Sequence, residues 1–332
     1  MKLMKKSIRI SLTILSLGFL NLPTYAQKAD KTIARVNYKL THIEDTTNRD
    51  KPHTENMLLV VGNNASVFTS LDKINRNKEM EASVQQQMKE QAGSGSFNLK
   101  LNNFSTKPTT NIDIYQFTNE KKRYINERLI NNYLVDEKVE PIQWKISKDT
   151  ANFHGVKCQK AIANYKGREW IAWFSQDYPM SAGPWKLGGL PGLIIQAHDK
   201  KNEVVFEFDG IELVKPNSAE QKTEDISMGP NTRIIGLSNN VYYGEEIKIP
   251  SDATIITPKE MDKLKEIREK DPEGFQKSQL ASLQTGMGVR TGTASVSPNQ
   301  ISSVTVNTAP SGGTTKRPVR VINNPIELPV KK

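Results

Sequence analysis

The chain has few of the residues that usually mark a cross-linked or reactive site. It contains one cysteine, Cys158, and four histidines among 332 residues. One cysteine cannot form an intramolecular disulfide, so a disulfide-stapled fold is excluded, and we expect Cys158 to be a buried small apolar residue. The sequence also lacks the H-E-x-x-H zinc motif and the G-x-S-x-G turn of serine hydrolases.

Long apolar runs are absent except near the N-terminus. Four positive charges in the first nine residues precede the apolar run 10–20, which is too short to span a bilayer. Small residues then end at Ala26, so we predict a secretory signal peptide over 1–26 and a mature chain that begins at Gln27. That chain has no further apolar span and no cysteine at its start. We expect a soluble envelope protein, either periplasmic or peripherally associated with the outer membrane.

An excess of charge of one sign is also missing from most of the chain. The formal net charge is +10, and four of the positive charges lie in the predicted signal peptide, which leaves +6 for the mature chain. Lysine and arginine are interspersed with aspartate and glutamate instead of forming a basic stripe. This distribution is typical of a solvated mixed-charge surface, so we expect no nucleic-acid partner.

Short apolar segments, bounded by glycine, asparagine, aspartate or proline, fill the first two thirds of the mature chain. Alternation over 34–40 predicts a strand, and the runs 57–61 and 65–69 flank Gly62-Asn63-Asn64 as in a β-hairpin. At least eight such segments are present. They predict a mainly β fold, an antiparallel curved sheet or half-barrel, within a domain that spans 27–250.

Two regions have a helical pattern. Met80, Val84 and Met88 recur at four-residue spacing among polar residues, which predicts a helical insertion at about 70–96. Thr257-Pro258, with Glu260 in the third helical position, forms a capping-box pattern, which predicts a C-terminal helix within 251–277. Pro272 and Gly274 are expected to end this helix.

The remaining C-terminal residues change character twice. Residues 278–317 are mostly Ser, Thr, Gly, Asn, Pro and Gln, which cannot bury enough apolar surface to offset the entropy lost on ordering. We expect a disordered, low-complexity tail there. Residues 318–332 are apolar again and are expected to return to the sheet as a short edge strand.

Spacing alone assigns no catalytic, cofactor-binding or metal-ligating residue. Gly183 and Gly188 have the spacing of a phosphate-binding loop, but Gly189 and Leu190 replace its Lys and its Ser or Thr. No histidine is paired with another histidine at metal-binding spacing. Two long-range arrangements stay open. A metal site could form around His154 with Cys158 or around His198 with Asp199, and a hydrolytic pair could bring Ser175 or Cys158 to His154 or His198.

The segment from His154 to Asp199 holds three of the four tryptophans and a resemblance to a known family. Residues 189–194 read Gly-Leu-Pro-Gly-Leu-Ile, and the chain from about Met57 to Asp209 resembles the GLPGLI family of bacterial envelope proteins, found largely in the Bacteroidetes. The resemblance implies an exported β-rich protein, with no cofactor or catalytic residue to carry over. The flanking segments that agree are Gly155–Ala161, Gly167-Arg168, Ala172–Phe174, Gly183-Pro184 and Asn324–Leu328.

The hexapeptide also has a physical interpretation. Pro191 restricts one backbone angle, while the neighbouring glycines allow angles closed to other residues, so the motif encodes a particular chain path. It could form a structural corner that closes the sheet on its core, or its apolar side chains could line a groove for a ligand or partner. The residues that would form either are Gly189, Leu190, Pro191, Gly192, Leu193, Ile194, Trp173 and Trp185.

Three functional hypotheses follow, and the sequence favours the first. It is a non-catalytic envelope protein that binds an apolar ligand or an envelope protein partner. The resemblance implies an accessory role beside outer-membrane transport systems. The alternatives are a hydrolase with an unrecognised site and a purely structural envelope component.

Overall fold

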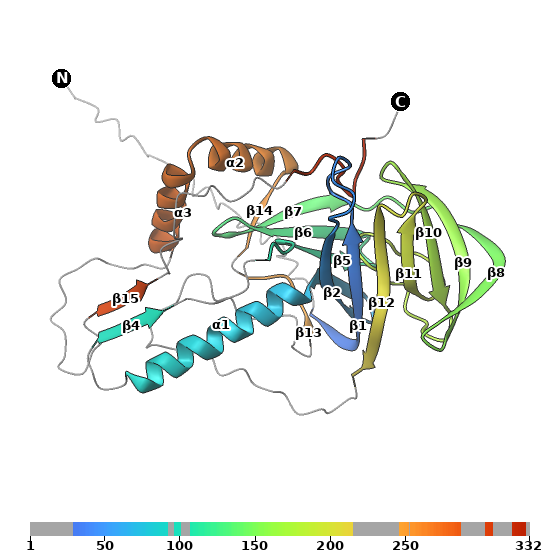
Figure 1. Cartoon of the computed structure of the whole chain (residues 1–332), viewed down its shortest axis with the longest axis horizontal. Helices are drawn as coiled ribbons and strands as arrows, with labels where there is room; N and C mark the ends of the chain where they lie inside the picture. Colours follow the sequence, from blue (N-terminus) through green and yellow to red (C-terminus); the bar gives the residue numbers. More distant parts are fainter. Residues whose placement is uncertain are drawn as a thin grey trace, which may run out of the picture.

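The computed structural model describes residues 29–91, 96–100, 107–214, 246–251, 253–286, 303–307 and 321–329. The predicted signal peptide lies outside these ranges. The described chain is mainly β, and one 13-stranded sheet dominates it in the order β14-β7-β6-β5-β3-β2-β1-β12-β11-β10-β9-β8, with β13 paired to β1 (Figure 1). The two ends of this order, β14 and β8, are not paired with each other, so the sheet is open.

The strands of this sheet are β1 (Asp30–His42), β2 (His53–Gly62), β3 (Ala65–Ser70), β5 (Ile112–Phe117), β6 (Lys122–Arg128), β7 (Asn132–Lys138), β8 (Lys145–Phe153), β9 (Val156–Tyr165), β10 (Arg168–Ser175), β11 (Leu193–Asp199), β12 (Val204–Leu213), β13 (Glu246–Ile247) and β14 (Thr254–Ile256). A separate parallel pair consists of β4 (Ser96–Lys100) and β15 (Ser303–Asn307). The helices are α1 (Leu71–Glu90), α2 (Pro258–Lys270) and α3 (Pro272–Gly286).

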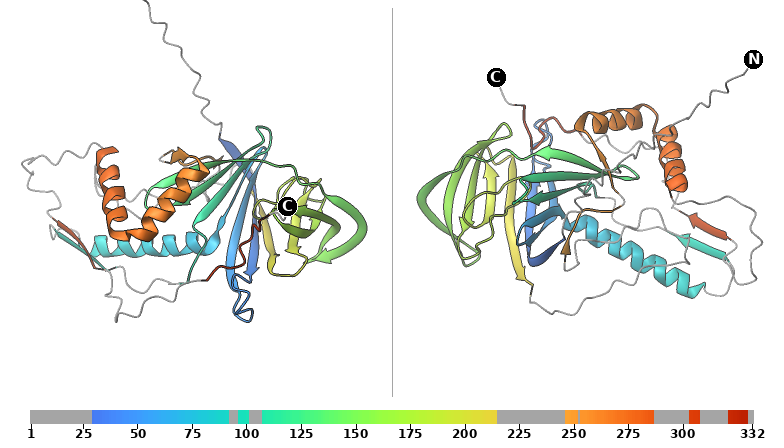
Figure 2. Two further views of the ribbon diagram at one scale, coloured as in Figure 1. Left: turned by 90° about the horizontal axis from the view of Figure 1, so that it is seen from above. Right: turned by 180° about the vertical axis from the view of Figure 1, so that it is seen from behind.

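The predicted fold class is confirmed: an open, mostly antiparallel sheet with a helical insertion and a helical C-terminal region. The part of the sheet that contains β8–β11 lies at the end remote from the three helices, as both views from front and behind show (Figures 1 and 2). In the large sheet, only β14 pairs in parallel, with β7.

The sequence of strand β2 is a continuous apolar run because both faces of the strand are buried. Leu59 packs into an inner core that also contains Trp170 and Phe206, while Leu58 packs into an outer core with Ile74 of α1. A strand buried on both faces needs apolar side chains at every position. Helix α1 is capped by Ser70 and supplies the cover on the outer face.

The C-terminal region differs from the predicted boundaries of the β domain and of the helix that follows it. The capping box of α2 is present at Thr257, but β14 extends the sheet beyond residue 250. A second helix, α3, starts at Pro272, where we expected the C-terminal helix to end. Asp271 accepts a hydrogen bond from the Gly274 N–H at 2.9 Å, so aspartate before proline begins a new helix at this point.

The prediction of a disordered tail over 278–317 is wrong in two places. Helix α3 continues to Gly286 and is held by Gln279, whose side-chain oxygen accepts from Tyr133 Oη at 2.6 Å. Residues 303–307 form β15, where the β-branched Val304, Thr305 and Val306 favour a strand. The rest of the predicted tail lies outside the described residues.

The C-terminal strap, defined as residues 321–329, returns to the folded body but does not form the expected edge strand. Its backbone makes isolated hydrogen bonds instead of a ladder. The Asn324 N–H donates to the Glu44 carbonyl at 2.9 Å, and the Leu328 N–H donates to the Lys166 carbonyl at 3.0 Å. Pro325 and Pro329 have no N–H to give a strand ladder. The strap is therefore anchored mainly by side chains.

The main anchor of the strap is Arg168, at the start of β10, which is almost fully buried. Its Nε donates to the Ile326 carbonyl at 2.8 Å, and Nη2 donates to Asn324 Oδ1 at 2.8 Å and to the Pro325 carbonyl at 2.7 Å. Nη1 contacts Asp199 at 2.8 Å and Glu203 at 3.4 Å. All five guanidinium N–H groups thus have an acceptor.

We predict that Arg168→Met lowers the free energy of unfolding by about 3–5 kcal/mol, because Asp199 and Glu203 would lose their buried counter-ion. Urea denaturation measures the change. The control Lys270→Met removes an exposed pair with Glu266 and should cost less than about 1 kcal/mol. Equal losses in the two variants would contradict the anchoring role of Arg168.

His42 belongs to the same network and makes stability depend on pH. Its Nε2 donates to the Asn324 carbonyl at 2.8 Å. Burial lowers the pKa of His42 below its ordinary value of 6.5, and the positive charges of Arg168 and His53 lower it further, against the opposing effects of the Asn324 carbonyl and Glu44. The folded state therefore keeps His42 neutral at a pH where the unfolded chain is already protonated.

We predict that the contribution of His42 to stability is complete above about pH 6.5 and is lost as the pH falls below it. In denaturation experiments between about pH 8 and about pH 5, His42→Gln should lose less stability than the parent chain, since glutamine can donate the same bond but does not titrate. An unchanged pH dependence in the variant would contradict this.

Candidate functional site

The loop 176–192, between β10 and β11, folds onto the inner core of the sheet. Trp185 and Leu187 are buried in this core, and the Trp185 ring lies 5.4 Å from that of Trp170. Backbone bonds hold the loop to β11, from Leu193 to the Tyr178 carbonyl at 2.9 Å and from Ile194 to that of Ala182 at 3.0 Å. The loop therefore closes one side of the core.

The two glycines of the hexapeptide are required for different structural reasons. Gly192 has φ +153°, and a Cβ there would lie 2.1 Å from the Ser175 carbonyl oxygen, so the strand end of β10 passes against its backbone. Gly189 has φ +82°, but a Cβ would meet nothing within 4 Å. Gly192 is required by close packing, and Gly189 by backbone conformation alone.

The apolar side chains of the motif face the closed core. Leu190 is 2% exposed and Leu193 is fully buried, as is Ile194, whose carbonyl accepts from Tyr38 Oη at 2.6 Å. Trp185 is also buried, whereas Gly189 and Pro191 are exposed. The apolar side chains of the motif therefore pack into the core as a structural corner.

Trp173 is the one half-buried side chain of the predicted set. Its ring lies 5.5 Å from that of Phe153, and Lys160 Nζ lies 5.8 Å from its centre. Trp173 is thus only partly buried and packs against the core that contains the leucines of the hexapeptide.

Within the described ranges, neither Ser175 nor Cys158 makes a hydrogen bond to a histidine. Ser175 is buried, and its Oγ accepts from the Asp177 N–H at 3.3 Å. The Cys158 thiol faces the Val156 carbonyl at 3.5 Å. Burial, with a further contribution from the charge of Asp177, raises the pKa of Cys158 to about 11, which disfavours the reactive thiolate.

The two histidines proposed for metal binding have other neighbours. The His154 ring packs 6.1 Å from that of Phe208, and His198 Nδ1 lies 3.0 Å from the Asp199 carbonyl oxygen. No cluster of three or more His, Cys, Asp or Glu side chains suited to a metal occurs in the part of the chain that the structure describes.

A small pocket lined by both charged and apolar side chains lies directly beside the motif loop. Its volume is about 160 Å³, and Gly188 and Gly189 form one wall. Trp144 Nε1 donates to the Gly188 carbonyl at 2.8 Å and so holds this wall in place. The other lining residues are Gln116, Phe117, Thr118, Lys121, Arg123, Val139, Glu140, Pro141, Ile142, Ser181 and Lys186.

Two buried cations of this pocket, Arg123 and Lys186, belong to one ionic cluster. Arg123 is 2% exposed, donates to Tyr165 Oη at 3.0 Å and to the Lys186 carbonyl at 3.2 Å, and lies 3.3 Å from Glu137. The Lys186 ammonium contacts both Glu137 and Glu327 of the strap. The cluster thus connects the sheet, the motif loop and the C-terminal strap.

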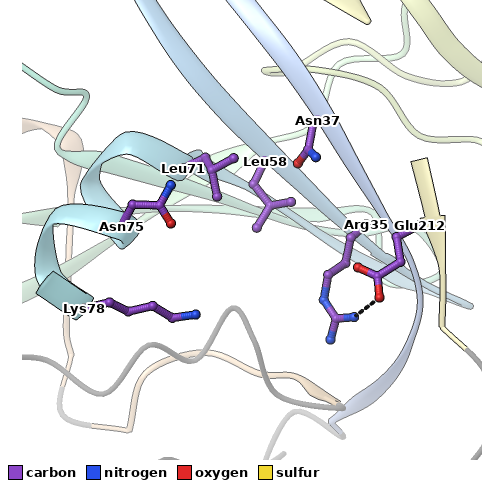
Figure 3. A pocket seen from close by; sticks show the side chains of 7 residues that line it. All are labelled: Arg35, Asn37, Leu58, Leu71, Asn75, Lys78 and Glu212. Atoms are coloured by element: carbon purple, nitrogen blue, oxygen red, sulfur yellow. Dashed lines mark ion pairs between the residues drawn. The ribbon is translucent and has the colours of Figure 1, made fainter. Parts of the chain in front are cut away.

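A larger depression of about 330 Å³ lies on the opposite face of the sheet, against α1 (Figure 3). Arg35 and Glu212 point toward each other there as an ion pair at 3.7 Å, while Leu58 and Leu71 lie side by side. The remaining lining residues are Asn37, Asn75 and Lys78. This depression shares no residue with the motif, so we take the pocket beside the motif as the candidate site.

Sequence reasoning missed the ionic cluster. Lys186 follows Trp185 inside an apolar, glycine-rich segment, and a lone charge in such a segment is a signal that could have been noticed. Arg123 and Glu137 lie in strands with many exposed charges, so nothing distinguishes them before the strands are paired.

Comparisons with known proteins add little about this site. No protein-family model and no curated protein matches the chain. Eight chains of solved structures match, among them PNGF-II in space groups P21 and C2, with 12% and 11% identity and TM-scores of 0.42 and 0.43. Each comparison covers 70% of this chain and 32% of the other, so this chain spans about a third of the length of those structures. Such a low similarity carries no argument about function.

A separate property concerns the membrane. Over the described ranges, no helix is long and apolar enough to span a bilayer.

We predict that the two motif glycines differ in their tolerance to alanine. Gly192→Ala should lower the free energy of unfolding by at least about 3 kcal/mol, because the new methyl group would collide with the Ser175 carbonyl. Gly189→Ala should cost only about 1–2 kcal/mol, the cost of a left-handed backbone. Thermal and urea unfolding of both variants test this, and similar losses would show that close packing at Gly192 is unimportant.

Proposed function

We propose that this chain is an exported protein of the GLPGLI type that acts in the bacterial envelope by binding a partner protein. The hexapeptide and its flanking segments support the family assignment. Two of those segments, which lie far apart in sequence, meet where Arg168 donates to Asn324. This contact gives a physical reason why both segments belong to the same family sequence pattern.

The observation that carries the binding hypothesis is the pocket beside the motif loop. Its wall at Gly188 and Gly189 belongs to a loop whose neighbouring side chains are buried in the core. A site built on such a fixed loop can bind without a large ordering cost. We assign the motif a supporting role and the pocket rim the contact with the partner.

A protein partner fits this site better than an apolar ligand. The apolar side chains of the motif are directed into the core, whereas the pocket is lined by charged and polar side chains together with Phe117, Val139, Pro141 and Ile142. Protein interfaces combine apolar contacts with a polar rim, so a lining of both kinds suits a protein partner. The periplasm or the inner side of the outer membrane is the proposed location, in keeping with an accessory role at an outer-membrane transport system.

We predict that Ser181→Trp, which fills the pocket from an exposed position, reduces recovery of the partner at least about tenfold. The experiment captures proteins from a solubilised envelope with the tagged full chain, identifies them by mass spectrometry and repeats the binding with the purified partner.

The matched control is Ser251→Trp, at an exposed serine outside the pocket, which should recover the partner as the parent chain does. Both variants should unfold at the parent temperature. Equal recovery by the two variants, or no enriched envelope protein at all, would contradict the proposal.

A further inference from the structure

We infer that the pocket beside the motif is a carboxylate-binding site and that Glu327 of the C-terminal strap competes for its Lys186 ammonium. This inference rests on the proposed function, since it names the chemistry that the same pocket would recognise.

The charges of the pocket are the first argument. Three cationic residues line it, Lys121, Arg123 and Lys186, against a single acidic residue, Glu140. Clefts lined mainly by one sign of charge concentrate ligands of the opposite sign. An anionic group is therefore the best match to this wall.

The second argument is that the sheet supplies too few carboxylates for the buried cations. Glu137 is shared by the two buried cations, Arg123 at 3.3 Å and Lys186. It also lies 3.8 Å from the half-buried Lys166, which has Glu140 as a second partner at 3.9 Å. The Lys186 side chain is only 7% exposed, and a buried ammonium is costly without a counter-ion. A second carboxylate is therefore needed at Lys186.

Glu327 supplies that carboxylate from outside the sheet. It belongs to the strap, and its side chain is 41% exposed, unlike that of Lys186. An exposed carboxylate on a segment without strand pairing can be exchanged more easily than Glu137 of β7. Glu327 thus has the position of an internal ligand that an external carboxylate can replace.

The size and opening of the pocket define the ligand further. A volume of about 160 Å³ holds a small acid or the end of a larger chain, below the size of typical drug-sized sites. A Cβ at Gly189 would meet nothing within 4 Å, so the backbone at this wall is open to an approaching group. The carboxylate could belong to a small dicarboxylic acid or to the C-terminus of a peptide.

The test uses Glu327→Gln in the full mature chain and isothermal titration with three probes: succinate, a short peptide with a free C-terminus, and the same peptide amidated. Removing the competing charge should tighten binding of a carboxylate probe about tenfold, which corresponds to about 1.4 kcal/mol. The control Glu207→Gln removes an exposed carboxylate of β12 and should bind as the parent does. Lys121→Ala, at an exposed lining residue, should weaken binding without loss of fold.

The probes distinguish the sources of the carboxylate. Binding of succinate alone identifies a small acid, and binding of the free but not the amidated peptide identifies a chain terminus. Equal affinity of Glu327→Gln and the parent chain, or no binding of any carboxylate by a folded Glu327→Gln protein, would overturn the inference. A partner captured through the pocket despite that result would leave the proposed function standing, whereas carboxylate binding without any protein partner would contradict the proposed function alone.

Discussion

The guanidinium of Arg168 connects three parts of the chain that are remote in sequence. It bridges the start of β10, the turn between β11 and β12 through Asp199 and Glu203, and the C-terminal strap through Asn324. Asp199 in turn accepts from the N–H groups of Glu203 and Val204 at 2.6 and 3.0 Å, so the carboxylate is itself fixed. A buried arginine is stable only when every donor is satisfied, and that requirement determines where the strap can lie.

The position of the strap has a consequence at the candidate site. Because Asn324 is held at Arg168 and Leu328 bonds to Lys166, Glu327 between them is brought to Lys186 of the motif loop. The other side of that loop is held where Gly192 packs against Ser175. The loop beside the pocket is thus held from the sheet and from the strap, so its geometry depends on contacts outside the hexapeptide.

Local sequence patterns correctly predicted the strands and helix starts that depend on neighbouring residues alone. Alternation along β1 agrees with its alternating burial, and the capping box at Thr257 starts α2. The same local signals failed at Pro272, because aspartate followed by proline can both end one helix and begin another. Lys186 alone carries a local signal, as a single charge in an apolar segment, but its meeting with Arg123 and Glu137 could not be predicted. These residues come together only through the pairing of β6 with β7 and the return of the loop before β11.

The motif itself shows why a sequence signature need not mark the residues that contact a ligand. Its leucines are apolar because they enter the core, and Gly192 is a glycine because a carbonyl oxygen occupies the space of a side chain. Both constraints act on the chain path and would hold whatever the protein binds. The charged residues that line the pocket lie beside this path, where Lys186 and Arg123 belong to the ionic cluster with Glu137. A hexapeptide that specifies the corner can therefore remain the same while the neighbouring charges set the chemistry of recognition.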